Sequence, residues 1–117
     1  MADIERLNVE ARFSDAAIHA GVVYLAGQVP DDATQDIVGQ TRQVLATIDR
    51  LLAEAGSDKT RILRAQVYLA DIADFDGMNA AWDAWVAKGN APPRATVEAR
   101  LARPEWRVEI VVTAAVG

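Results

Sequence analysis

Apolar and polar positions alternate along several short stretches of this chain, as they do in strands with one buried face. Between residues 94 and 101, the odd-numbered positions are alanine, valine or leucine and the even-numbered ones are polar. Pro92 and Pro93 come directly before this stretch and keep its approach out of a helix. The pattern predicts an extended segment in which a stiff lead aims Arg94.

Further strands are predicted at residues 4–9, 16–20, 22–27, 62–70 and 108–114. The Ala20-Gly21 pair predicts a tight hairpin turn between the second and third of the chain's strands. Residues 22–25 are almost continuously apolar, which predicts a strand buried on both faces. Within 62–70, one face is expected to carry Leu63, Ala65, Val67 and Leu69.

Two longer stretches change to steps of three and four residues, which predicts helices. The first runs from about 36 to 55, with Gly56 expected just past its C-terminus. The second runs from about 75 to 87, with Asp71 or Asp74 as its N-cap. Its apolar stripe is expected to consist of Phe75, Met78, Trp82, Trp85 and Val86.

The predicted order is β-β-β-α-β-α-β-β, in a single domain spanning residues 1–117. Packing both helices on one face of one mixed sheet is the economical solution, so the fold class is α+β. The other sheet face would stay uncovered, which suggests self-association. Its polar row is predicted to consist of Arg64, Gln66, Tyr68, Thr96 and Glu98.

Composition narrows the possible partners. No apolar run reaches the roughly 20 residues of a membrane span, and no signal peptide is recognisable, so we expect a cytoplasmic protein without a membrane partner. The absence of cysteine excludes disulfides, thiolate metal sites and a cysteine nucleophile. The single histidine, His19, cannot form a histidine metal cage or a two-histidine nuclease site within one chain. The net charge of −5 argues against a nucleic-acid partner.

Arg94 and Glu109 are the candidate chemical groups. A guanidinium can hold a small planar carboxylate through two parallel hydrogen bonds, which the point charge of lysine cannot do. Glu109 is the one acid in an otherwise apolar strand, and it could handle water or protons. The alternatives are a structural salt bridge of Arg94 at a subunit edge and pairing of Glu109 with a cation such as Arg107 or Arg94.

Seven short segments, in one order along the chain, resemble the reactive intermediate deaminase (Rid, YjgF-type) family. They are GQVP at 27–30, QTRQ at 40–43, AEAG at 53–56, VYLAD at 67–71, DF and MN within 74–79, PRATVE at 93–98 and VEI at 108–110. The resemblance implies a fold like the trimeric type of chorismate mutase. It also implies a homotrimer with ligand clefts between subunits.

The implied activity is that of a metal-free 2-iminobutanoate or 2-iminopropanoate deaminase, which needs no cofactor and limits metabolite damage. By resemblance, Arg94 holds the substrate carboxylate and Glu109 lies near the attacking water. Gly27, Phe13 and Asn79 would line the cleft. The archetype carries cysteine at the position of Thr96 and tyrosine at that of Phe13, so Thr96 would contribute only its hydroxyl or N–H.

Three classes of function remain open on the sequence. The first is an imine or enamine deaminase. The second is a non-catalytic trimer that binds small carboxylates in the same cleft. The third is a ribonuclease or translation inhibitor, an activity also credited to the family, against which acidity and the single histidine argue.

Overall fold

A computed structural model describes residues 3–117. The elements follow in the order β1 (Glu5–Val9), β2 (Ser14–His19), β3 (Val22–Leu25), α1 (Ile37–Glu54), η1 (Lys59–Arg61), β4 (Ile62–Leu69), η2 (Ile72–Asp74), α2 (Phe75–Trp85), β5 (Arg94–Glu98) and β6 (Val108–Ala115), where η marks a 3₁₀ turn. The predicted sequence of strands and helices is confirmed.

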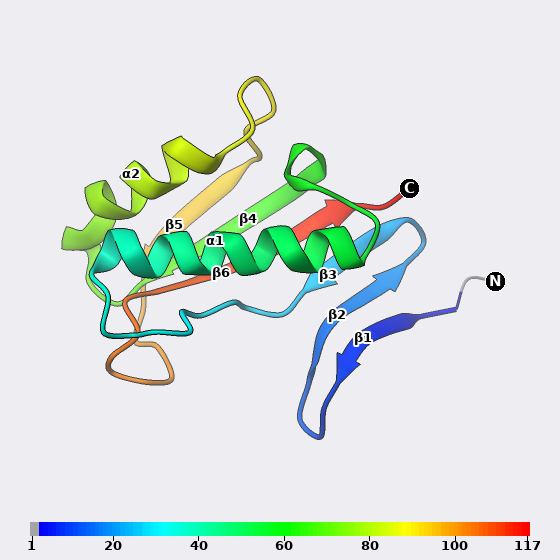
Figure 1. Ribbon diagram of the computed structural model, residues 1–117, viewed down its shortest axis with the longest axis horizontal. Helices are drawn as coiled ribbons and strands as arrows, with labels where there is room; N and C mark the ends of the chain where they lie inside the picture. The colour runs from blue at the N-terminus through cyan, green and yellow to red at the C-terminus, as the bar shows by residue number, and fades with distance from the viewer. Residues whose placement is uncertain (1–2) are drawn as a thin grey trace.

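The strands form one six-stranded sheet in the order β1-β2-β3-β6-β4-β5. Its pairs are antiparallel except for β4 and β5, which run parallel. Both helices lie on the same side of this mixed sheet, and the β1–β2 hairpin extends beyond them (Figure 1). The predicted α+β class is therefore confirmed. None of the helices in residues 3–117 combines the length and apolar character needed to cross a membrane.

The core lies between α1 and the central strands. Val67, Leu69, Ile110 and Val112 on the sheet, and Val44, Leu45, Ile48 and Leu52 on α1, are all at most 1% exposed. Burial of such a side chain stabilises the fold by about 1.5–3 kcal/mol. The buried residues of α1 recur at steps of three and four, as expected of a helix with one face in the core.

The ends of the elements follow from local chemistry. The Asp36 side chain accepts a hydrogen bond from the Gly39 N–H at 2.9 Å and so caps α1. Ala20 and Gly21 both have positive φ, 51° and 78°, as the tight turn between β2 and β3 requires. Asp71 caps the η2 turn, whereas Asp74 makes no capping bond and instead lies 3.5 Å from the Arg107 guanidinium.

Two predictions about strand faces were wrong. Tyr24 in β3 is 50% exposed, because the helices cover only the face that carries Val23 and Leu25. Leu63 is 48% exposed and does not share a face with Ala65, because a register shift against β6 separates Ile62 from Arg64. Alternation counted along the sequence misses such an irregularity.

Two further predictions about buried and open faces need correction. Thr96 and Glu98 were expected on the uncovered face, but they pair with Val67 and Leu69 and so lie on the helix-facing side. Phe75 was placed in the buried stripe of α2, yet it is 39% exposed because it starts the helix beside the η2 turn.

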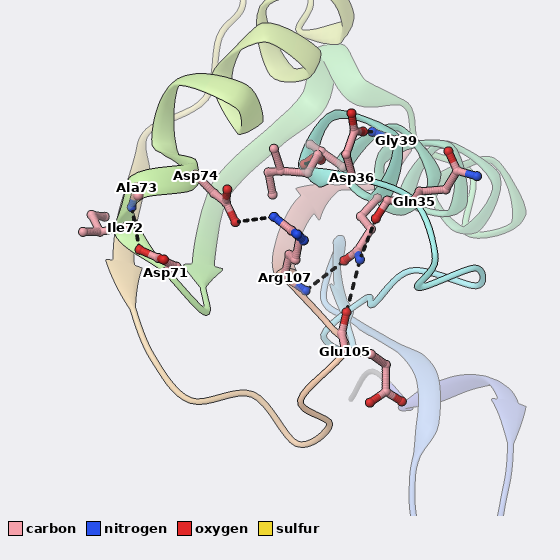
Figure 2. A network of polar contacts seen from close by, with 12 residues as sticks. Gln35, Asp36, Gly39, Asp71, Ile72, Ala73, Asp74, Glu105 and Arg107 are labelled. Atoms are coloured by element: carbon pink, nitrogen blue, oxygen red, sulfur yellow. Dashed lines mark hydrogen bonds and ion pairs between the residues drawn. The ribbon is translucent and has the colours of Figure 1, made fainter.

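Gln40 is a buried polar residue of α1 that links two loops. Its side-chain amide donates to the carbonyls of Ala33, Gln35 and Glu105, each at 3.2 Å, and accepts from the Arg107 N–H at 2.8 Å. Figure 2 shows these contacts converging between Gln35, Glu105 and Arg107. Arg107, which directly precedes β6 and lies two residues before Glu109, is thereby fixed to α1.

Candidate functional site

Arg94 begins the edge strand β5 on the helix-facing side of the sheet. Its guanidinium carbon lies 4.9 Å from the centre of the Trp82 ring, and its Nη1 lies 3.9 Å from the Met78 sulfur. Burial lowers the pKa of Arg94, and the charge of Asp83 partly opposes this shift. Because a guanidinium is not deprotonated in proteins, the side chain stays a cation near neutral pH.

Thr96 follows Arg94 on the same face of β5. Its hydroxyl is buried and has no hydrogen-bond partner within residues 3–117. A buried hydroxyl without a partner is rare in proteins, so Thr96 is an unusual feature of this edge of the sheet. Asn79 is half-buried on α2, one residue after Met78 and three before Trp82. Arg94, Thr96 and this part of α2 are thus brought together at one edge of the sheet.

Glu109 lies in β6 on the opposite, helix-free face of the sheet. It is paired with Tyr68 of β4, so both side chains project from the same face. Burial raises the pKa of Glu109. Its carboxylate also packs against Gly27, where an added Cβ would come 2.1 Å from Oε2. Glycine at position 27 therefore makes room for this acid.

A cleft of about 290 Å³ opens beside Glu109. It is lined by Tyr68, Glu109 and Val111 from the sheet and by the segment 99–102 that follows β5. The segment contributes Arg100 and Leu101. Glu109 therefore borders an open space that is also lined by the guanidinium of Arg100 and the phenol of Tyr68.

Arg94 and Glu109 do not meet within one chain. Arg94 pairs with Ala65, whereas Glu109 pairs with Tyr68, three residues further along β4. The separation is two strands, at about 4.8 Å each, and three residues, at about 3.3 Å each, and the side chains leave opposite faces. A site that uses both needs a second chain.

The other predicted residues divide between the two locations or lie apart from them. Gly27 belongs with Glu109, and Thr96 lies on the same face of β5 as Arg94. Asn79 directly follows Met78, which contacts Arg94. Phe13 is 55% exposed where β1 turns into β2, on the outer hairpin. His19 is exposed at the end of β2, beside the hairpin turn.

The alternative roles of Arg94 and Glu109, as partners in structural ion pairs, can be compared with the contacts that their side chains make. No carboxylate of residues 3–117 lies within 4.0 Å of a charged nitrogen of Arg94, and none of the cations described lies that close to Glu109. Arg107 instead contacts Asp74. Neither an internal salt bridge of Arg94 nor a pairing of Glu109 with Arg107 occurs in the described structure.

Sequence reasoning missed three neighbours of the candidate residues. Trp82 was interpreted as core alone, yet it is both buried and stacked on Arg94. Tyr68 was predicted on the open face, but its place beside Glu109 depends on the register between β4 and β6. Arg100 could not, since it lines the Glu109 cleft only through the path of the chain after β5.

Comparison with known proteins places the chain among relatives of the same length. The family model described as endoribonuclease L-PSP matches residues 3–116. A RutC family protein of Haemophilus ducreyi is 58% identical over 114 residues, covering 97% of each chain. The RutC family protein YoaB of Escherichia coli is 49% identical over 113 residues, covering 97% of this chain and 98% of its own.

Solved structures agree with this grouping. A member of the YjgF protein family from Neisseria meningitidis has a TM-score of 0.96 and 51% identity, with 98% of this chain and 96% of that one covered. A protein from Salmonella typhimurium described as a putative translation initiation inhibitor has a TM-score of 0.90 and 46% identity, with 97% of each chain covered. Matches of this extent concern the whole fold described above, including both candidate locations.

Proposed function

This chain belongs to the YjgF-type family, and on that basis we propose that it hydrolyses small 2-imino acids, or their enamine tautomers, to 2-oxo acids and ammonia. Arg94 holds the substrate carboxylate, and Glu109 handles the water. The observation that carries the proposal is the state of Arg94: a half-buried cation fixed by Trp82, without a carboxylate partner in residues 3–117, beside the buried unpaired hydroxyl of Thr96.

Desolvation makes an unpaired guanidinium a favourable partner for an incoming anion. A carboxylate can satisfy two of its N–H groups at once, which fixes the plane of the adjacent C=N bond. This orientation supplies much of what an intrinsically easy hydrolysis requires.

The chemical step adds water across the C=N bond. Glu109 takes a proton from water as the water oxygen bonds to the imine carbon, and it passes this proton to the imine nitrogen, which gives a neutral carbinolamine. Glu109 then helps to move a proton from the new hydroxyl to the nitrogen, the C–N bond breaks, and C=O and ammonia form. The raised pKa suits this exchange, because a carboxyl that titrates closer to neutrality both accepts and returns protons.

The site is completed, in this proposal, by self-association into a homotrimer. Tyr24, Leu63 and Val97 are 44–50% exposed, and Tyr24 and Val97 lie on the helix-free sheet face. Large apolar side chains left open on a sheet suit a contact with another copy. Such a contact would bring Arg94 of one protomer toward Glu109 of its neighbour.

The test is a competition assay. An amino-acid oxidase generates 2-iminopropanoate or 2-iminobutanoate continuously, and semicarbazide traps the imine that has not hydrolysed. Added protein is expected to lower the rate of semicarbazone formation and to speed ammonia release. If neither rate changes across several side chains while titration still detects carboxylate binding, the protein is a binder instead.

The ribonuclease activity named in the family description finds little support in the chain. Its net charge is −5, and His19 stands alone at a hairpin end. Cleavage of RNA that persists through repeated purification and is lost in His19→Ala would nevertheless establish it.

A further inference from the structure

The cleft beside Glu109 contains a cation of its own chain, Arg100, to which the proposed reaction assigns no role. Arg100 lies just after β5, in the segment that lines this cleft. It is exposed, and no carboxylate of residues 3–117 lies within 4.0 Å of its charged nitrogens. Arg100 and Glu109 therefore line one cleft without forming an ion pair with each other, which leaves the guanidinium available to a ligand between them.

We propose that Arg100 binds a second carboxylate of the substrate, so that the preferred substrates are 2-imino acids with an acidic side chain. This inference rests on the proposed function, in which Arg94 of a neighbouring protomer holds the first carboxylate. Two guanidinium groups from different chains would then hold the two ends of a dicarboxylate.

The nearby charges fit a dianionic ligand. The carboxylate of Glu98, two residues before Arg100, is already engaged by the Ile72 N–H at 2.9 Å. The remaining lining residues are Tyr68 and small or apolar residues, apart from Glu109 itself. In a chain with a net charge of −5, a dianion is favoured only where cations are concentrated. Within one chain this cleft is lined by one cation, Arg100, so the second cation for a dianion would be Arg94 of the neighbouring protomer.

The size of the cleft also favours a substrate with a longer side chain. At about 30 Å³ per liquid water, 290 Å³ corresponds to about ten water molecules. A three-carbon imino acid leaves much of that space unfilled. The unfilled part is bordered by Arg100 and Leu101, where a side-chain carboxylate and its methylene group could lie.

The experiment compares kcat/KM for 2-iminosuccinate, generated by an oxidase acting on aspartate, with that for 2-iminopropanoate. The native protein is expected to favour the acidic imine. Arg100→Gln should lower kcat/KM for 2-iminosuccinate about tenfold or more, because a charge-assisted hydrogen bond is lost, and should change the value for 2-iminopropanoate less than about twofold. Arg100→Lys should retain an intermediate preference.

Arg103→Gln is the matched control. Arg103 lies three residues further on, stacks on Trp106 at 5.6 Å and lines the adjoining cleft but not the one with Glu109. It should leave the preference unchanged. The inference is overturned if the native protein shows no acidic preference, or if Arg100→Gln affects both imines equally.

Failure of the proposed function would be recognised separately, because the native protein would then hydrolyse neither imine. Calorimetric titration with succinate and butanoate tests Arg100 in that case. Tighter binding of succinate that disappears in Arg100→Gln supports the second carboxylate site. Equal affinities for the two ligands overturn it.

Discussion

At the scale of single residues, the Arg94 guanidinium is held in place by an aromatic ring and a thioether rather than by an opposite charge. The contacts with Trp82 and Met78 fix its position, and no carboxylate of residues 3–117 lies within 4.0 Å of its charged nitrogens. A cation–π contact contributes only about 0.5–2 kcal/mol, so it does not replace a carboxylate partner. A binding site for an anion requires a cation that is held in position without a close carboxylate partner.

Replacement of Arg94 by alanine should therefore affect activity more than folding. We expect kcat/KM for 2-iminopropanoate to fall at least about 100-fold, since a bidentate charged pair is lost. The free energy of unfolding should fall by no more than about 2 kcal/mol. Imine trapping and urea denaturation measure the two effects. Arg50→Ala, which removes an exposed arginine paired with Glu54 on α1, should change neither, and an equally inactive Arg50→Ala would contradict the assignment.

Glu109 should make stability depend on pH. Burial raises its pKa in the folded chain above the ordinary value of 4.5, so the folded state binds this proton more tightly than the unfolded state does. The resulting stabilisation is complete below pH 4.5 and is lost as the pH rises through the raised pKa. Glu109→Gln cannot lose it, so the difference in Tm, variant minus native, should become more positive from pH 4 to pH 8. A constant difference would show that the carboxyl is not perturbed.

At the scale of elements, Gln40 joins α1 to the loop that leads into β6. Gln40→Ala leaves buried groups without partners, among them the Arg107 N–H, and should cost at least about 2 kcal/mol in urea denaturation at fixed protein concentration. Gln43→Ala, three residues along the same helix, removes contacts of exposed groups with Asp32 and should cost less than about 1 kcal/mol. Similar costs for the two variants would show that Gln40 is no more important than a surface amide.

The elements themselves could be predicted from the sequence, because the spacing of apolar residues, the helix caps and the turn residues depend only on nearby positions. Asp36, Gly56 and the Ala20-Gly21 pair bounded their elements as expected. Which face of the sheet each strand residue occupies was harder to predict. The irregularity at Leu63 and the assignment of Thr96 to the helix side depend on the register between strands, which no single stretch of sequence encodes.

At the scale of the whole molecule, the candidate site could be predicted only in part. Resemblance suggested Arg94 and Glu109 as a pair, but the sheet puts them on opposite faces, with β4 between β5 and β6. Contacts between distant segments, such as Arg94 with Trp82 or Arg100 with the Glu109 cleft, arise from the path of the chain. Contacts between chains are harder still to predict from the sequence, because they also depend on how folded chains pack together.

In the proposed function, the opposite placement of Arg94 and Glu109 makes activity depend on assembly, and Tyr24 offers a way to test this. Its ring is 50% exposed on the helix-free face, paired with Thr113, four residues along β6 from Glu109. A lysine there puts a charge into the proposed contact between protomers without touching either candidate residue. Tyr24→Lys should therefore remain folded by circular dichroism.

In the native protein, light scattering should give about three times the chain mass of 12.6 kDa, and Tyr24→Lys should approach the mass of one chain and lose imine hydrolysis in parallel. Phe75→Lys, at a comparably exposed ring on α2, should keep both the mass and the activity, because α2 covers the other face of the sheet. If the native protein is active as a single chain, Arg94 and Glu109 do not act together on one substrate, because no second chain would then be present to bring them together.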